Sequence, residues 1–259
     1  MGTLPTGDDA GGKNDVTALT LHGDYPSALA ELRVAPETSV SLLNQANILA
    51  LLGRFDEVQI NLARVAAMLP SDPTLRSSIA IVRARVSLGR GETEPATRHA
   101  RRALDLIRID EVASIDDTVR TIHIEALVVL CRANVIARRV AAAQPFCGEA
   151  VERAGVFADP GLTTLTLLAE AEARLADGDA SGAATLAEEA IDIASTLDHT
   201  PYQLQALSLA SRAYGRLNDQ RENRFRGYAA SATDTLHSAW GAEALAIYLQ
   251  RVDLDTVLR

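Results

Sequence analysis

The sequence is poor in lysine and in aromatic residues, and it is acidic overall. Among its 25 basic residues only Lys13 is a lysine, and its formal net charge is -9. Because phosphate binding requires a concentrated positive face, this balance argues against nucleic acid as a partner. Aromatic residues make up 4% of the 259 positions, while 47% are hydrophobic. The chain can therefore bury a large core, made mostly of small and aliphatic side chains.

Long apolar runs are also missing. The run at residues 124–131 contains Glu125 and ends at Arg132, well short of the roughly 20 residues that a membrane-spanning helix needs. The first 14 residues are polar and glycine-rich. We therefore expect no secretory signal and no membrane anchor, a disordered segment at 1–14, and a cytoplasmic protein.

Cysteine is scarce, which argues against a fold stabilised by several disulfides or by a structural zinc ion. Cys131 and Cys147 are the two cysteines of the chain. They are too few for a disulfide framework and match no zinc spacing. We expect both to be small, buried core residues with inert thiols.

From about residue 15 onward, apolar residues recur at three- and four-residue spacing, and no window alternates with period two. This pattern predicts helices and no strand. Prolines interrupt it at regular intervals, as they do between helices. We expect first helices of successive hairpins at 39–52, 73–89, 114–137, 160–177 and 201–217, and second helices at 55–69, 93–108, 140–155, 180–197 and 220–237. A last helix near 239–250 is expected to cap the open end, with Trp240 and Tyr248 packed in its core.

Small residues recur at fixed offsets around a series of turns. The turn column consists of Gly53, Gly91, Arg138, Gly178 and Asn218. Seven residues before each turn lie Ala46, Ala84, Cys131, Ala171 and Ser211. Three further columns lie five, nine and twelve residues after the turn, and their members in the last copy are Asn223, Gly227 and Ala230. A truncated copy at the front has Gly23 as its turn and Ala28 at the matching offset. Small residues at matched places let two helices approach closely, so the repeating unit is a helical hairpin. Stacked hairpins close the apolar faces that each leaves open.

The turns resemble those of the tetratricopeptide-repeat (TPR) family. The matching stretches are Gly23-Asp24-Tyr25 with Ala28, Leu52-Gly53-Arg54-Phe55-Asp56-Glu57, and Asp177-Gly178-Asp179 with Ala183. Successive small residues of the first column lie 38, 47, 40 and 40 residues apart, and this longer period is similar to the variant in bacterial regulators of the MalT type. The resemblance covers residues 15–237. It implies an all-α fold, a right-handed superhelical stack of helical hairpins forming a TPR-like α-solenoid, with residues 238–259 as a C-terminal capping helix and tail.

A polar residue follows the small residue of each first helix. This column consists of Asn47, Arg85, Arg132, Glu172 and Arg212, and Asn44 lies one turn before Asn47. The resemblance implies that first helices line the concave face, so these six residues are our candidate partner-binding site. Arginine suits that role because its guanidinium holds a carboxylate with two hydrogen bonds. Without a ligand, Glu172 can pair with Arg132 or Arg212. A solvated helix face produces the same pattern, so this alternative stays open.

Signals for chemistry are absent from the sequence. The five histidines lie at no metal-ligand spacing, and no serine stands in a G-x-S-x-G turn. We therefore expect no metal site, no cofactor and no enzymatic activity. The leading hypothesis is a non-catalytic module whose concave groove binds a protein or peptide segment, acidic or carboxylate-terminated. The alternative is a small-molecule or signal-peptide sensor of the MalT type, and a homo-oligomer stacked through a terminal hairpin is also open.

Overall fold

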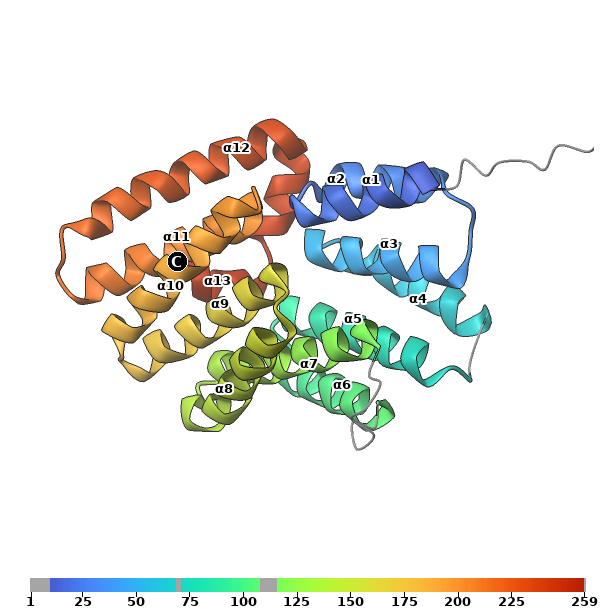
Figure 1. Cartoon of the computed structure of the whole chain (residues 1–259), viewed down its shortest axis with the longest axis horizontal. Coiled ribbons are helices and arrows are strands. Elements are labelled where there is room, and N and C mark those ends of the chain that lie inside the picture. The colour runs from blue at the N-terminus through green and yellow to red at the C-terminus, as the bar shows by residue number, and fades with distance from the viewer. Residues whose placement is uncertain (1–9, 69–70, 108–115, 259) are drawn as a thin grey trace, which may run out of the picture.

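The structure is a computed structural model that describes residues 10–68, 71–107 and 116–258. These ranges hold thirteen helices and no strand. The helices are α1 (Ala10–Leu21), α2 (Tyr25–Val34), α3 (Ser39–Leu52), α4 (Phe55–Met68), α5 (Pro73–Gly89), α6 (Thr93–Leu106), α7 (Asp117–Ile136), α8 (Val140–Phe157), α9 (Pro160–Asp177), α10 (Ala180–Thr196), α11 (Thr200–Arg216), α12 (Arg221–Leu249) and α13 (Val252–Leu258). The predicted all-α stack of hairpins is confirmed (Figure 1).

Left-handed residues end the first helices at the predicted turn column. Gly53, Gly91 and Gly178 have φ values of 85°, 76° and 94°, and Arg138 and Asn218 have 57° and 54°. At the first of these turns, the amides of Gly53 and Arg54 donate to the carbonyls of Ala50 and Leu49, which satisfies the end of α3. The repeat thus selects a backbone conformation, which two non-glycine residues also adopt.

The small-residue columns lie where the hairpins pack, except in the last copy. Ala46, Ala84, Cys131 and Ala171 are fully buried. On α12, however, Gly227 and Ala230 are exposed, and the buried positions are shifted to Phe225, Ala232 and Leu236. The shift follows from a bulky contact, because the ring of Phe225 stacks on Tyr214 with centroids 5.4 Å apart. The predicted register of this last helix is therefore wrong by two residues.

Two boundaries differ from those expected. Helix α1 begins at Ala10, so residues 10–14, expected to be disordered, are helical in the structure, while 1–9 lie outside the described residues. Helix α7 begins at Asp117, where the side chain of Asp116 accepts a hydrogen bond from the amide of Thr118. This cap sets the start of the helix.

The two cysteines form a disulfide between α7 and α8. Their predicted burial is confirmed, but the expectation of two free thiols is wrong. The reason lies in the repeat itself, because Cys131 and Cys147 occupy facing small-residue columns of one hairpin. Close helix approach brings their Cα atoms to 5.1 Å, within the range that a disulfide spans.

The stack closes on itself, so that its first hairpin meets its last (Figure 1). Tyr25 of α2 packs its ring 5.5 Å from that of Trp240 of α12, and its hydroxyl lies 3.2 Å from Nε2 of His199. A single apolar cluster contains buried residues from α2 to α5 and from α9 to α13. The hydrophobic core is therefore continuous where the two ends of the repeat array meet. We call this junction the seam.

The C-terminal region turns inward at the seam. Helix α12 is kinked at Gly241, with φ 80° and ψ 165°, and α13 follows it into the middle of the ring of helices (Figure 1). Trp240 and Tyr248 are buried, as expected. The sequence predicts one helix at the open end, whereas the structure adds α13, whose Leu254 and Val257 are buried inside. Among the described helices, none is long and apolar enough to cross a membrane.

Candidate functional site

The concave face of the stack is occupied by the chain's own C-terminal segment, residues 250–258. Asp253 places its carboxylate 2.7 Å from Nη2 of Arg251 and 3.5 Å from Nη1 of Arg132. Arg132 also donates from Nη2 to the backbone carbonyl of Asp253 at 2.7 Å. Arg251 donates from Nη1 to the carbonyl of Leu51 on α3 at 2.6 Å. These bonds hold the segment against two first helices, α3 and α7.

The charges that hold this segment are buried and opposed. Burial acts to raise the pKa of Asp253, but Arg251 and Arg132 outweigh it and lower that pKa below its ordinary value. Burial acts to lower the pKa of Arg132, but Glu172 and Asp253 raise it overall. Asp253, Arg132 and Arg251, whose pKa is also raised, are therefore charged in the folded protein. Because each is removed from water, the loss of one would leave a partner uncompensated.

The structure brings four of the six candidate residues into two pairs. Arg132 of α7 and Glu172 of α9 form an ion pair at 2.9 Å, the pairing expected when no ligand is bound. Arg85 of α5 bonds to Asn47 of α3 and to Glu125 of α7.

The remaining two candidates are Asn44 and Arg212. Asn44 is exposed on α3. Arg212 is half-buried on α11, where burial lowers its pKa and Glu172 opposes that effect. The six residues therefore do not form one open ladder. Sequence reasoning missed Asp253 and Arg251, which belong to no repeat column, and Glu125, which the chain places one hairpin away from Arg85.

A small cavity beside this segment, about 60 Å³, is lined in part by Tyr25, Tyr202, Tyr248 and Gln205. Gln205 donates to the Tyr248 hydroxyl at 3.0 Å. Burial raises the pKa of Tyr202 to about 12, as expected of a phenol kept from water. Since one water takes up about 30 Å³, this space admits water but no peptide while the C-terminal segment is in place.

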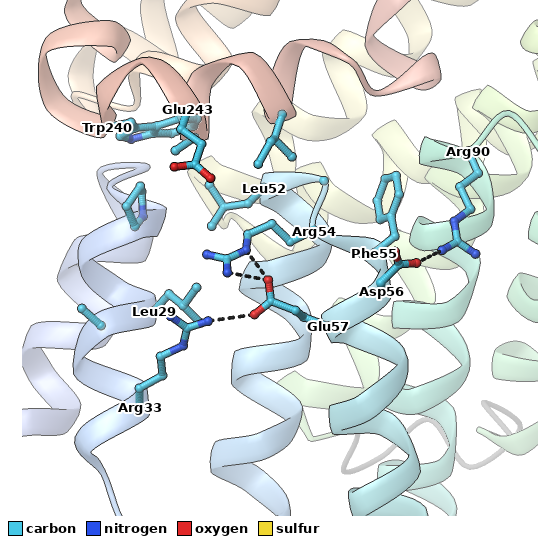
Figure 2. Close-up of a pocket in the computed structure, with 15 residues that line it drawn as sticks. Leu29, Arg33, Leu52, Arg54, Phe55, Asp56, Glu57, Arg90, Trp240 and Glu243 are labelled. Atoms are coloured by element: carbon cyan, nitrogen blue, oxygen red, sulfur yellow. Dashed lines mark hydrogen bonds and ion pairs between the residues drawn. The ribbon is translucent and has the colours of Figure 1, made fainter.

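A larger hollow, which we call the seam cleft, opens where the two ends of the array meet (Figure 2). Its volume is about 780 Å³. The lining comes from α2, from the α3–α4 turn, from the end of α5 and from α12 beyond Trp240, and consists of Pro26, Leu29, Ala30, Arg33, Leu52, Gly53, Arg54, Phe55, Asp56, Glu57, Arg90, Trp240, Glu243, Ala244 and Ile247. Segments distant in sequence thus build one surface.

Arginines frame the seam cleft. Figure 2 shows Arg33 of α2 and Arg54 of the turn both pointing at Glu57, with Arg33 Nη2 at 2.9 Å from its carboxylate. Arg90 pairs with Asp56 at 2.8 Å. Each guanidinium has five N–H groups, so one shared carboxylate leaves donors of Arg33 and Arg54 for a further acceptor.

The wall between these charges is apolar. Pro26, Phe55, Ala244 and Ile247 are half-buried there, and Glu243 reaches in from α12 above them (Figure 2). Glu243 forms no ion pair with a described residue. An apolar wall with a charged rim is the arrangement found in protein recognition surfaces. In the described part of the chain, no group of three or more metal-ligating side chains is assembled.

Solved structures share this architecture. BtubC (BKLC) from P. vanneervenii aligns over 88% of this chain and 90% of its own, with 16% identity and a TM-score of 0.58. A Rap protein complexed with competence and sporulation factor aligns over 95% of this chain and 68% of its own, with 13% identity and a TM-score of 0.65. A putative kinesin light chain of TPR-like repeats from Podospora anserina aligns over 80% of this chain and 100% of its own, with 15% identity and a TM-score of 0.50.

The fold is that of TPR-like repeat proteins. The resemblance seen in the turns is thereby confirmed for the architecture. Identities of this size establish the fold alone. No family model matches the sequence, and no curated protein matches it.

Proposed function

We propose that the chain is a non-catalytic protein-binding module, and that a short segment of its partner binds in the seam cleft. One observation carries this proposal: the concave face is filled by residues 250–258, while the seam cleft is open and combines half-buried apolar side chains with arginines. Binding on this surface removes apolar area from water without displacing any part of the fold.

The chemistry of the cleft indicates what the segment carries. An apolar side chain fits against Phe55 and Ile247. A carboxylate, either a side chain or a chain terminus, fits the unused donors of Arg33 and Arg54. The acidic or carboxylate-terminated partner expected for the concave face is therefore proposed for this cleft instead. The Rap neighbour, complexed with competence and sporulation factor, supports a peptide as the occupant.

The test fills the cleft with a side chain. Ala30 is exposed and lines the cleft, so Ala30→Trp should occupy it while leaving the core intact. Ala63→Trp is the matched control, because Ala63 is an exposed helical alanine on α4 outside the cleft. Proteins that co-purify with the wild-type chain and with A63W, and are lost with A30W, are the expected result. Equal recovery with all three chains would exclude the seam cleft.

A second candidate, the sensor of the MalT type, is favoured by one observation. The cleft volume of about 780 Å³ lies within the 300–1,000 Å³ typical of small-molecule sites. A ligand there would contact both ends of the array and stabilise their closure. A metabolite that raises the melting temperature of the wild-type chain, and not of A30W, in the absence of any protein would favour this sensor over the protein-binding module.

A cytoplasmic location completes the proposal. In that compartment the Cys131–Cys147 pair would be held as two thiols, since disulfides are rare there. Trapping the thiols by alkylation in intact cells, followed by mass measurement, tests the location. A disulfide recovered intact would contradict it.

A further inference from the structure

A second hollow lies on the outside of the stack, between α4, α5 and α6. We call it the basic cleft. Its volume is about 350 Å³, and it is lined by Ala66, Arg76, Ile79, Ala80, Arg83, His99 and Arg102. No carboxylate is among these residues, although the chain as a whole has a formal net charge of -9. The basic cleft is therefore a local reversal of the charge of the protein.

Helical spacing puts these side chains on shared faces. Arg76, Ile79, Ala80 and Arg83 are three, four and seven positions apart on α5, which is one face of a helix. His99 and Arg102 are three positions apart on α6. Ile79 and Ala80 are buried, so the floor of the cleft is apolar and its two walls are basic.

The arginines of the basic cleft differ from those of the concave face and the seam cleft. Arg85, Arg132 and Arg33 all pair with carboxylates of the chain itself. By contrast, Arg76, Arg83 and Arg102 form neither an ion pair nor a side-chain hydrogen bond with any described residue.

The pKa of His99 is lowered in this positive environment. Burial lowers its pKa, and the neighbouring Arg83, Arg98 and Arg102 lower it further, while Glu92 acts in the other direction. Like charges gathered in this way favour an anionic partner, since it relieves their mutual repulsion.

We propose that the basic cleft docks an acidic segment of a partner protein. Arg76 and Arg83 are seven positions apart, which is about 10 Å along a helix. That span exceeds a single carboxylate or phosphate and matches several carboxylates carried on one segment. The apolar floor at Ile79 receives an uncharged side chain between them. A nucleic acid is disfavoured because the surrounding protein is acidic.

The test measures binding of a labelled oligoglutamate peptide by fluorescence anisotropy. Arg76→Gln, Arg83→Gln and Arg102→Gln together keep the aliphatic stems and remove the charges. Arg153→Gln, Arg174→Gln and Arg226→Gln form the matched control, because these arginines are exposed on α8, α9 and α12 and the control changes the net charge equally. We expect the cleft variant to bind the peptide about tenfold more weakly, because it loses three contacts with the free energy typical of exposed ion pairs. The control variant should bind like the wild type.

Three results would overturn the proposal. The first is no binding by the wild-type chain at low salt, where surface electrostatics are strongest. The second is an equal loss in the cleft and control variants, which would mean that total charge alone decides. The third is tighter binding of a labelled oligothymidylate than of oligoglutamate, which would assign the surface to nucleic acid. Circular dichroism of each variant verifies that it is folded. Oligoglutamate lacks the apolar side chain proposed for the seam cleft, so A30W should bind it like the wild type, and this separates the two sites.

Discussion

Tyr25 and His199, which are 174 positions apart in the sequence, bring the hydroxyl of one and Nε2 of the other to 3.2 Å. His199 is also the N-cap of α11, where its Nδ1 accepts the amide N–H of Tyr202 at 3.2 Å. Because Nδ1 accepts, it carries no proton, and Nε2–H donates to Tyr25. Neutral His199 thus joins the two ends of the repeat array, and a protonated ring would lose its cap.

Acid should therefore weaken the closed stack. Burial lowers the pKa of His199 to about 4, below its ordinary value of 6.5. Between these values the unfolded chain binds more protons than the folded one, so the free energy of unfolding falls as the pH decreases from 6.5 to 4. The loss through this residue approaches about 3 kcal/mol. Urea denaturation across that range measures it.

Two variants identify the source of the acid effect. His199→Asn keeps a capping side chain and should flatten the pH dependence, leaving the smaller part due to His99 and His123, whose pKa values are also lowered. His237→Asn, at an exposed position, should leave the dependence as in the wild type. An unchanged slope in H199N would show that the seam is not closed by a neutral imidazole.

Alanine substitutions at two glycines distinguish the loss of packing at the seam from the cost of a left-handed backbone conformation. Gly23 and Gly178 both have positive φ, so alanine costs about 1 kcal/mol of conformational energy at each. At Gly23 the added Cβ would also lie 2.5 Å from Cδ of Pro201, whereas at Gly178 nothing lies within 4 Å. Gly23→Ala should thus destabilise the fold by about 1–3 kcal/mol more than Gly178→Ala. Equal losses in thermal denaturation would contradict the packing of the first hairpin on α11.

The C-terminal segment should stabilise the whole protein through Asp253. Asp253→Asn removes the carboxylate between Arg132 and Arg251 and should lower the free energy of unfolding by about 3 kcal/mol, since two buried guanidiniums lose their counter-charge. Asp234→Asn, at an exposed position on α12, should cost less than about 0.5 kcal/mol. Chemical denaturation of both variants makes the comparison. Similar small losses would mean that the segment is not docked.

The disulfide offers a prediction that the sequence could not make. Cys131 and Cys147 are 16 positions apart, and closing a loop of that size contributes about 3 kcal/mol in the chain-entropy description. Reductant should lower the stability of the wild-type protein by that order. A variant with Cys131→Ala and Cys147→Ala should not respond to reductant. A wild-type protein that is equally indifferent would contradict the bond.

The sequence predicted the repeats better than the site, for a physical reason. Helix ends, turns and close packing are set by neighbours in the chain, so the left-handed turns at Arg138 and Asn218 could be read from the columns. The occupation of the concave face depends on Asp253, which meets Arg132 across 121 positions. No periodic pattern carries such a contact. The seam cleft was missed for the same reason, since residues near Ala30 and Ala244 share it only after the stack closes.

Hydrogen exchange of the protein, free and bound to the partner recovered with the wild-type chain, tests the central claim most directly. A seven-residue helix such as α13 is not stable alone, so slow exchange of its amides reports docking on the concave face. We predict slow exchange in α13 both with and without the partner, and new protection at α2, the α3–α4 turn and residues 242–249. Faster exchange of α13 on binding would contradict the account, because the partner would then replace the C-terminal segment instead of filling the seam cleft.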